Sequence, residues 1–492
     1  MNKKLFLLIA SISFFSCSQE ALTEVTDDTL SVDEVSTTTQ SLLIDKDAVS
    51  LTSVDAKNVA ALFRSKNGGA SSRSASALAS ESTNVEIILD STTSEPLLYI
   101  INWADDGGFV VVSATKKCFP VACYSETGNF SLDADPASKS YLEGYKSLVR
   151  DALNDTSDSL RTRYALEWSV FEKSGTASAG VSSRATSSDI QDMIDEEIAT
   201  KTALGYTYIG KITAAVDYLT AIDYAALIED VSTHTDSDYD YEEVSLFFIK
   251  TYTSTSIGPL MGTEWSQNEP FNVDAPNDKA GCVPIALGQI VYYHKYPEDR
   301  YDWDGMTSIS EDNEAFVYFI KDIRSLCNVI YNDDGKTSSS YKDALIALDS
   351  LNYEATLNES PTASSLSSSI KSYNPVYMRG IRYEEQEDGE VETIGHAWVC
   401  EGYEKIVYKG VISMIPDIKY SLVSTSSSLY QEYTFSITNT TLIDTSLYGD
   451  FFYMNMGWGG KCNGWYRSNA YIDDDGHSYL ENQKIILIEE GD

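Results

Sequence analysis

The order of secondary-structure signals in the C-terminal half limits the folds open to this chain. Past about residue 257, an apolar run of helical character, KAGCVPIALGQIVYYHKYP (279–297), comes before strand-like runs such as HAWVCEGYE (396–404) and DFFYMNMGW (450–458). A helix followed by strands is typical of an α+β domain, whereas a doubly wound fold alternates strands and helices. We therefore expect an α+β domain over residues 257–492.

A second unit is expected upstream, because a chain of 492 residues exceeds the size of one usual hydrophobic core. The runs VEIILD, LLYIINWA and GGFVVVSA are rich in Val and Ile and predict a small antiparallel sheet. Helical periodicity comes before them at residues 53–65 and after them in SKSYLEGYKSLVRDALND. Together these signals predict a compact α+β domain over residues 48–172.

The two predicted units are separated by sequence of a different composition. Stretches dominated by Ser and Ala at 66–82 and 173–189 lack periodic apolar positions and indicate loops or linkers. Residues 190–250 are acidic and mixed, and they fit either a small subdomain or an extended connector. We therefore assign residues 173–256 as a linker and acidic connector without a predicted structure.

The first 17 residues, MNKKLFLLIASISFFSC, combine two lysines, a short apolar core and small residues. The apolar part is too short to span a bilayer comfortably, so residues 1–17 predict an export signal rather than a membrane helix. A serine before Cys17 resembles a bacterial lipoprotein cleavage site, with an ordinary secretion signal as the alternative. Residues 18–47 are then a tether. We expect an exported lipoprotein at the membrane or cell surface, anchored through Cys17, or a secreted protein after processing.

Charge and composition exclude several classes of function. The formal net charge is −40, from 75 acidic and 35 basic side chains, whereas nucleic-acid binding requires clustered Lys and Arg. The chain has only four histidines and no CxxC pair, so we expect no metal site and no cofactor. Apart from Cys17 there are six cysteines, and their spacing does not assign disulfides.

Cys282 stands between Gly281 and the apolar run of the expected helix. At a helix N-terminus, backbone N–H groups and aligned peptide dipoles favour a thiolate, and Pro284 suits the first turn. The alternative is a buried structural thiol, since free cysteines are among the most buried residue types. This segment alone leaves both interpretations open.

A thiolate nucleophile needs an imidazole partner, and the four histidines differ in their settings. His294 lies about 18 Å further along the same helix, at a rise of 1.5 Å per residue, so we expect a structural role. His234 lies in the acidic connector. His477 follows the Asp run of IDDDGH (472–477), which fits a solvated turn or, as the alternative, a calcium loop. His396 begins an alternating strand after Gly395, where it faces either a cleft or a core.

Three further residues have side chains suited to assist this pair. Asn455 ends an apolar strand and can accept the imidazole N–H, while Trp458 can shield that bond from water. Gln267 can join the Cys282 backbone N–H in stabilising an oxyanion. A turn asparagine, a core tryptophan and a surface glutamine are the respective alternatives. The chain order is Gln267, Cys282, His396 and Asn455, which is the order in papain-like cysteine peptidases.

Four segments resemble the site segments of the streptopain family, which are secreted bacterial zymogens of papain-like fold. They are GPLMGTEWSQNEPFN, AGCVPIALGQIVYYHKYP, GHAWVCEGYE and NMGWGGKCNGWY. Upstream, GGFVVVSATKKCFPVACYSETGNF is similar to the family's propeptide, so the resemblance covers most of the chain beyond the signal. It implies a two-lobed papain-like catalytic domain at 257–492, blocked by a small α+β propeptide domain with an antiparallel sheet at 48–172.

The resemblance also implies roles for the individual residues. Cys282 would be the nucleophile, His396 its base, Gln267 part of the oxyanion hole, and Asn455 and Trp458 the supports of the histidine. The protein would be a cysteine endopeptidase, a hydrolase made as an inactive zymogen. Its partners would be protein or peptide substrates and its own propeptide as intramolecular inhibitor.

Departures from the family pattern and rival functions remain. Met456 stands where the family often has Trp, and Pro284 and Ile285 replace smaller residues, but neither change removes a chemical group. We expect the full-length chain to be nearly inactive until the segment before about Ile257 is cut. The alternatives are a catalytically silent surface binding protein and an amidase or acyltransferase on the same fold.

Overall fold

The computed structural model describes most of the chain beyond its first residues. The predicted export signal with Cys17, the tether up to residue 41, and two of the histidines, His234 and His477, lie outside the described residues. No helix in the described part is long and apolar enough to cross a membrane. The described ranges are 42–67, 74–81, 83–132, 136–155, 159–172, 188–218, 224–225, 227–229, 232, 242, 245–332, 335–385, 391–414, 431–434, 449–468 and 483–491.

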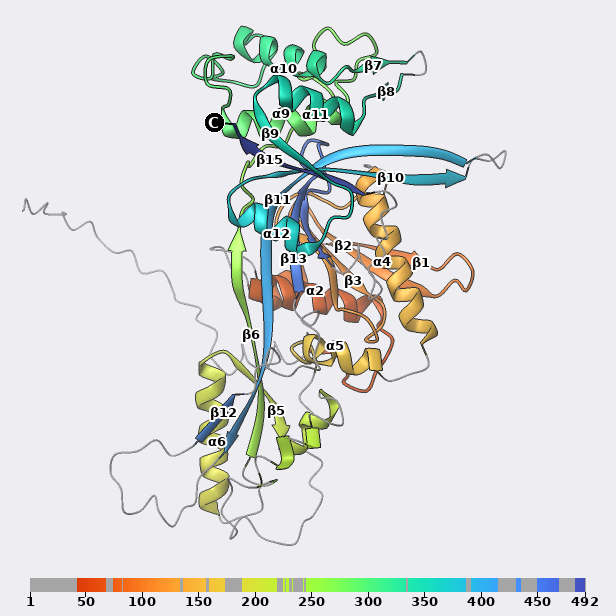
Figure 1. Cartoon of the computed structure of the whole chain (residues 1–492). Helices are drawn as coiled ribbons and strands as arrows, with labels where there is room; N and C mark the ends of the chain where they lie inside the picture. The colour runs from red at the N-terminus through yellow and green to blue at the C-terminus, as the bar shows by residue number, and fades with distance from the viewer. Residues whose placement is uncertain are drawn as a thin grey trace, which may run out of the picture.

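One large antiparallel sheet runs through the molecule (Figure 1). Within the described residues it has 13 strands, and its main path follows the order β1-β2-β3-β4-β14-β13-β11-β10-β15-β9. Helices from both halves of the chain pack on it. The predicted α+β class is therefore confirmed, with antiparallel pairing as expected for the N-terminal unit.

The N-terminal part forms strands where the Val- and Ile-rich runs predicted them. β2 is buried at almost every position because helices α2 and α4 both pack on it, which explains why its sequence is continuously apolar rather than alternating. The elements are α2 (Ser53–Asn67), α3 (Ala75–Ser80), β1 (Thr83–Leu89), β2 (Pro96–Trp103), β3 (Phe109–Ser113), β4 (Val121–Ser125), α4 (Pro136–Asn154) and α5 (Ser159–Ser169).

The acidic connector contributes secondary structure to the sheet. It holds α6 (Ser188–Ala203), β5 (Tyr206–Lys211), the 3-10 helix η1 (Ile212–Asp217) and β6 (Ser245–Ile257). β6 pairs with β11 along its whole length, from Ile257 opposite Tyr403 to Ser245 opposite Met414. These elements, with the distal half of β11 and with β12, form an arm that projects from the rest of the molecule (Figure 1). Residue 257 is therefore the end of a strand and not the end of a free linker.

The C-terminal half begins with helices and continues with strands, in the predicted order. Helices α9, α10 and α11 gather at one end of the molecule (Figure 1). The elements are α9 (Cys282–His294), α10 (Glu314–Leu326), β7 (Ile330–Tyr331), β8 (Thr337–Ser338), α11 (Tyr341–Ser350), β9 (Tyr353–Asn358), α12 (Ala363–Lys371), β10 (Val376–Glu385), β11 (Val391–Met414), β12 (Gln431–Thr434), β13 (Gly449–Asn455), β14 (Gly464–Arg467) and β15 (Lys484–Glu490).

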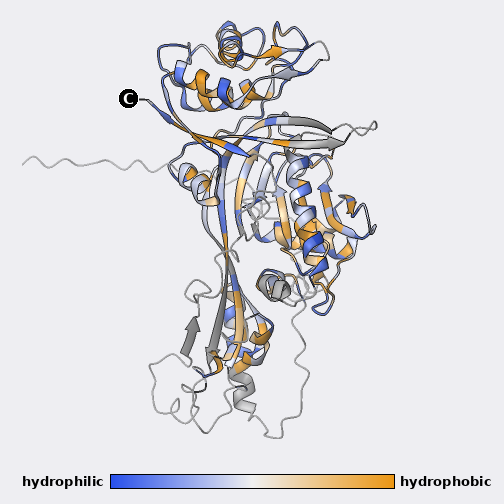
Figure 2. Ribbon diagram, turned by 45° about the vertical axis from the view of Figure 1, so that its right-hand side comes forward, coloured by the Kyte–Doolittle hydropathy of each residue, from blue (hydrophilic) through white to orange (hydrophobic). Residues whose placement is uncertain are grey.

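Within the described part of the chain, two hydrophobic cores hold these elements together. One lies among α9, α10 and α11 and the strand residues that face them. The other joins the N-terminal sheet and helices to C-terminal side chains that include Trp398, Phe452 and Tyr466. Figure 2 shows the apolar strands and helices of both regions. The predicted propeptide domain thus shares its core with the C-terminal strands.

The junction between the two halves is a strand pairing reinforced by buried polar contacts. β4 pairs with β14, with Tyr124 opposite Trp465. Tyr124 Oη donates a hydrogen bond of 2.8 Å to Glu404 Oε1 on β11. Glu167 of α5 forms a buried double ion pair with Arg467 of β14, at 2.6 and 2.8 Å. Such contacts require a fixed relative position of the two halves.

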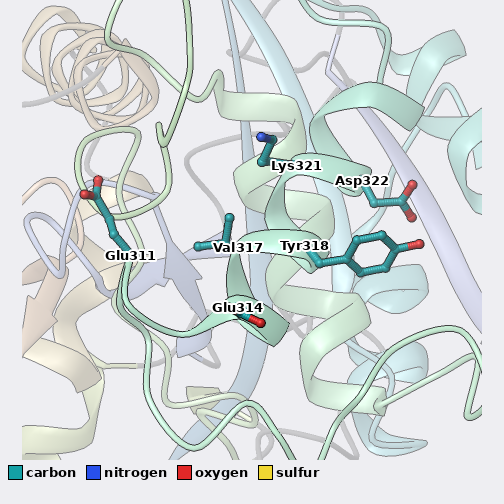
Figure 3. A pocket seen from close by; sticks show the side chains of 6 residues that line it. All are labelled: Glu311, Glu314, Val317, Tyr318, Lys321 and Asp322. Atoms are coloured by element: carbon teal, nitrogen blue, oxygen red, sulfur yellow. The ribbon is translucent and has the colours of Figure 1, made fainter.

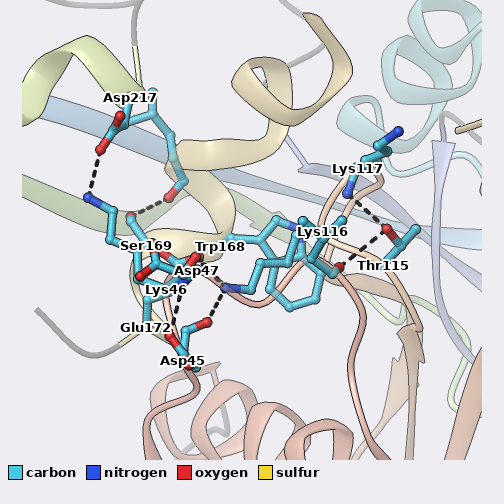
Figure 4. Close-up of polar contacts among 12 residues, drawn as sticks. Asp45, Lys46, Asp47, Thr115, Lys116, Lys117, Trp168, Ser169, Glu172 and Asp217 are labelled. Atoms are coloured by element: carbon cyan, nitrogen blue, oxygen red, sulfur yellow. Dashed lines mark hydrogen bonds and ion pairs between the residues drawn. The ribbon is translucent and has the colours of Figure 1, made fainter. Parts of the chain in front are cut away.

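Lys116 forms hydrogen bonds to Asp45 and Lys46, close to the start of the described chain (Figure 4). The ammonium group of Lys116 is buried, lies 2.7 Å from Glu172 Oε1, and donates to the carbonyl oxygens of Asp45 at 2.5 Å and Lys46 at 3.1 Å. Lys46 in turn pairs with Asp217 of η1 at 2.7 Å. Residues 45–46 therefore contact both the N-terminal domain and η1 of the arm.

Candidate active site

The proposed nucleophile lies where the sequence predicts it, at the first residue of a helix. α9 begins at Cys282, and the preceding Gly281 has a φ of 94°, a backbone conformation that favours glycine. The residues from Val283 to Val291 are all buried, so the helix is apolar on every side. Cys282 is partly exposed, and its own N–H group at the helix start hydrogen-bonds to the thiol.

His396 of β11 is the partner of this thiol. Burial of Cys282 opposes ionisation, but a hydrogen bond to His396, the charge of that ring, and the N–H groups of Ala397 and Cys282 outweigh it, so the pKa of the thiol is lowered. By contrast, burial raises the pKa of Cys118 to about 12 and also raises that of Cys400. The site thus favours a thiolate at Cys282 and not at these buried thiols.

One ring nitrogen of His396 donates a hydrogen bond to a backbone carbonyl. Nε2 lies 2.9 Å from the carbonyl oxygen of Met456, and His396 itself is 5% exposed. Because a carbonyl oxygen can only accept, Nε2 carries a hydrogen, and Nδ1 is left to face Cys282. This is the arrangement that a base for a thiol requires.

Asn455 has different partners from those expected. Its Nδ2 donates to the Thr263 carbonyl at 2.6 Å and to Glu401 Oε1 at 2.9 Å, while its Oδ1 accepts from the Gly457 N–H at 3.3 Å. The acceptor of the imidazole N–H is instead the backbone carbonyl of the next residue, Met456. Asn455 ends β13, and the chain turns directly afterwards at Gly457, where φ is 73°.

Two indole rings flank the imidazole. Trp458, expected from the sequence, is half-buried, and its ring centroid lies 6.1 Å from that of His396 at an interplanar angle of 35°. Trp398, which sequence reasoning did not single out, stacks on His396 at 6.1 Å and 10°. Its signal was available, because residues i and i+2 of a strand share one face.

Gln267 belongs to a segment held against the start of α9. Its carbonyl accepts a hydrogen bond of 2.9 Å from the N–H of Ala280, in the turn that leads into Cys282, and its side chain is 9% exposed. The Gly459 N–H donates to the carbonyl of Trp265 at 2.9 Å. The glycine-rich turn after Asn455 and the Gln267 segment therefore lie side by side.

Two other features do not belong to this site. His294 lies at the opposite end of α9, with Nδ1 3.3 Å from Tyr353 Oη, and burial lowers its pKa to about 4. A hollow of about 490 Å³ beside α10 contains none of the candidate residues (Figure 3). In the described part of the chain, no group of three or more His, Cys, Asp or Glu is placed to hold a metal ion. The residues of the hollow are Glu311, Glu314, Val317, Tyr318, Lys321 and Asp322.

Comparison with known proteins gives one family match. Residues 48–149 match the family model of the Spi protease inhibitor, within the predicted propeptide domain. No curated protein matches the chain. A fragment of Prevotella intermedia prointerpain A is 13% identical, with a TM-score of 0.40 and coverage of 82% of this chain and 98% of that one. The active interpain A cysteine protease of the same organism is 16% identical, with a TM-score of 0.31 and coverage of 48% and 95%. Residues 48–149, which precede the Cys282 site, thus match a protease-inhibitor family.

Proposed function

We propose that this protein is the zymogen of a cysteine endopeptidase of the streptopain family, with a two-lobed papain-like catalytic domain. One observation carries the proposal. Cys282 begins a helix and is hydrogen-bonded to His396, which lowers the pKa of the thiol, and the far side of the imidazole is held by the Met456 carbonyl. A merely structural thiol needs neither the helix N-terminus nor an oriented imidazole.

The chemistry follows from these positions. The Cys282 thiolate attacks the carbonyl carbon of a peptide, and the resulting oxyanion is stabilised by the Cys282 N–H and the Gln267 side chain, each contributing about 3 kcal/mol in the transition state. The His396 imidazolium gives its Nδ1 proton to the leaving amine, and a thioester remains. Water, deprotonated by His396, then attacks the thioester, which releases the acid and restores the thiol.

The N-terminal domain supplies the inhibition in this proposal. The match to a protease-inhibitor family supports it. So does the contact of Tyr141, on α4, with Trp398, whose rings lie 6.1 Å apart at 76°. Because Trp398 also stacks on His396, the N-terminal domain contacts the immediate surroundings of the base. Export and a lipid anchor at Cys17 belong to the same proposal and rest on the first 17 residues.

Casein hydrolysis by the purified chain, before and after cutting with trypsin that is then inhibited, tests the proposal. We expect little activity before cutting and strong activity after it, with none in Cys282→Ala. Equal hydrolysis by the Cys282→Ala protein would exclude this mechanism. A silent binding protein would not be labelled by a thiol-directed peptidase inhibitor, and an amidase or acyltransferase would act on cell-wall or acyl substrates rather than on casein.

A further inference from the structure

Glu401 is a buried carboxylate on the same strand as His396. It is 1% exposed, and among the described residues it forms no ion pair. Its partners are hydrogen-bond donors: Oε2 accepts from the Met261 N–H at 2.6 Å, Oε1 accepts from Asn455 Nδ2 at 2.9 Å, and the Gly262 N–H also donates. Neighbours on β11 such as Val399 are apolar, so core packing alone does not call for a carboxylate here.

The donors around Glu401 select a carboxylate over other side chains. Both oxygens face N–H groups, so both must accept. A glutamine in the same place would turn its NH₂ group, a donor, toward a donor. An apolar side chain would remove the oxygens that accept hydrogen bonds from the Met261 and Gly262 N–H groups and from Asn455 Nδ2. The position is thus built for two acceptor oxygens.

Glu401 is connected to the His396 imidazole by hydrogen bonds through Asn455 and the Met456–Gly457 peptide group. Glu401 and the Thr263 carbonyl hold Asn455 Nδ2, which directs Asn455 Oδ1 to the Gly457 N–H at 3.3 Å. That N–H and the Met456 carbonyl belong to the same planar peptide group. The orientation of the Met456 carbonyl, 2.9 Å from the imidazole Nε2, therefore depends on the Asn455 side chain.

Glu401 also holds the segment that leads to Gln267. Its backbone carbonyl accepts from the Leu260 N–H at 2.9 Å, in addition to the bond from Met261 to its side chain. Gly258 lies so close that an added Cβ would stand 2.4 Å from the Glu401 carbonyl oxygen. One residue thus contacts both the turn that orients His396 and the segment that carries Gln267.

We propose that Glu401 is a positioning residue for the Cys282–His396 pair, acting through Asn455 and the Met456–Gly457 peptide. The inference rests on the proposed function. Glu401 touches neither thiol nor substrate; it fixes the carbonyl that orients the imidazole. Removal of its acceptor oxygens lets Asn455 and the Met456 carbonyl move, so the imidazole loses its alignment with Cys282.

The test compares Glu401→Gln with Glu404→Gln. Glu404 is a second buried carboxylate on β11, but its hydrogen-bond partners are Tyr124 Oη of the N-terminal domain and the Ser256 side chain of β6. In the trypsin-activated protein, we expect Glu401→Gln to lower kcat about 100-fold while KM changes by less than about threefold. Glu404→Gln should leave both constants within about twofold of the unsubstituted protein.

A second readout is independent of peptide hydrolysis. The rate of Cys282 alkylation by iodoacetamide, measured against pH in the full chain, reports the thiolate–imidazolium pair. We expect the midpoint of this curve to move toward the ordinary thiol value of about 8.5 in Glu401→Gln and to stay in place in Glu404→Gln. If the protein cleaves no peptide but alkylation shows this difference, the positioning role stands and the proposed function fails.

Folding is checked by urea unfolding of each variant. If Glu401→Gln does not fold, Glu401→Asp takes its place, because it keeps the charge but shortens the side chain by one methylene group. A folded Glu401 variant with an unchanged kcat and an unchanged alkylation curve would overturn the inference. So would equal losses in the Glu401 and Glu404 variants.

Discussion

The buried ion pair between Glu167 and Arg467 should decide how firmly the N-terminal domain is docked. It joins α5 to β14, and its side chains are 0% and 1% exposed. Both carboxylate oxygens are used, at 2.6 and 2.8 Å. The guanidinium also lies over the rings of Phe119 and Phe451, at 5.1 and 5.7 Å from their centroids. The perturbation is Glu167→Gln, which keeps the shape and removes the charge.

The expected loss of folding stability follows from the burial of both side chains, Glu167 and Arg467. Removal of the Glu167 charge takes the bidentate partner from the buried Arg467 guanidinium, at a cost of about 3–5 kcal/mol. At 1.4 kcal/mol for each tenfold change, this corresponds to about a 100- to 4,000-fold shift of the folding equilibrium. Replacement of both partners by apolar residues, Glu167→Leu with Arg467→Met, should recover most of that loss, because no charge remains buried.

The assay is urea unfolding of the full chain in a Cys282→Ala background, which prevents self-cleavage. Glu143→Gln on α4 is the matched control, since Glu143 is 66% exposed and pairs with Lys146 at the surface. It should change the free energy of unfolding by less than about 0.5 kcal/mol. A loss below about 1 kcal/mol for Glu167→Gln, or a double variant less stable than the single one, would refute the reasoning.

Three further predictions concern activity and processing. Because His396 lowers the pKa of Cys282, its thiolate forms at a lower pH than that of an ordinary thiol. The rate of Cys282 alkylation should therefore rise with pH through a midpoint below about 8.5. A midpoint at or above that value would contradict the pairing of Cys282 with His396. Tyr141→Ala removes the aromatic contact with Trp398, so the uncut chain should hydrolyse casein faster. An unchanged rate would show that this contact does not contribute to inhibition. Since β6 is paired along its length with β11, mass spectrometry should find residues 188–257 in the active product, whereas a product that starts at Ile257 would show that the arm is dispensable.

Local signals account for the parts of the site that the sequence could predict. The glycine before Cys282 and the apolar run after it specify a helix start through backbone geometry and burial alone. The alternating strand after His396 likewise depends on neighbouring residues. Trp398 was missed, although the same alternation places it on the face of His396.

The hydrogen-bond partners of Asn455 could not be predicted from neighbouring residues in the sequence. Its amide oxygen and the Met456 carbonyl are close in sequence and are both acceptors, so the sequence does not distinguish them as partners of the imidazole. Strand register decides, because Asn455 stands opposite Val399 and its side chain is held by Glu401 and Thr263. Glu401 has no local signal at all: its donors come from segments far apart in the chain.

The sequence by itself determined the α+β class, the order of helix and strands, and the place of Cys282 at a helix start, since these depend on composition and spacing over short stretches. Only the tertiary structure decided that α6, β5, η1 and β6 form an arm with the distal half of β11, that the N-terminal domain shares a core with the C-terminal strands, and that a backbone carbonyl orients His396. The physical reason is that strand pairing and buried hydrogen bonds join residues distant in sequence, and their partners are selected by the whole fold.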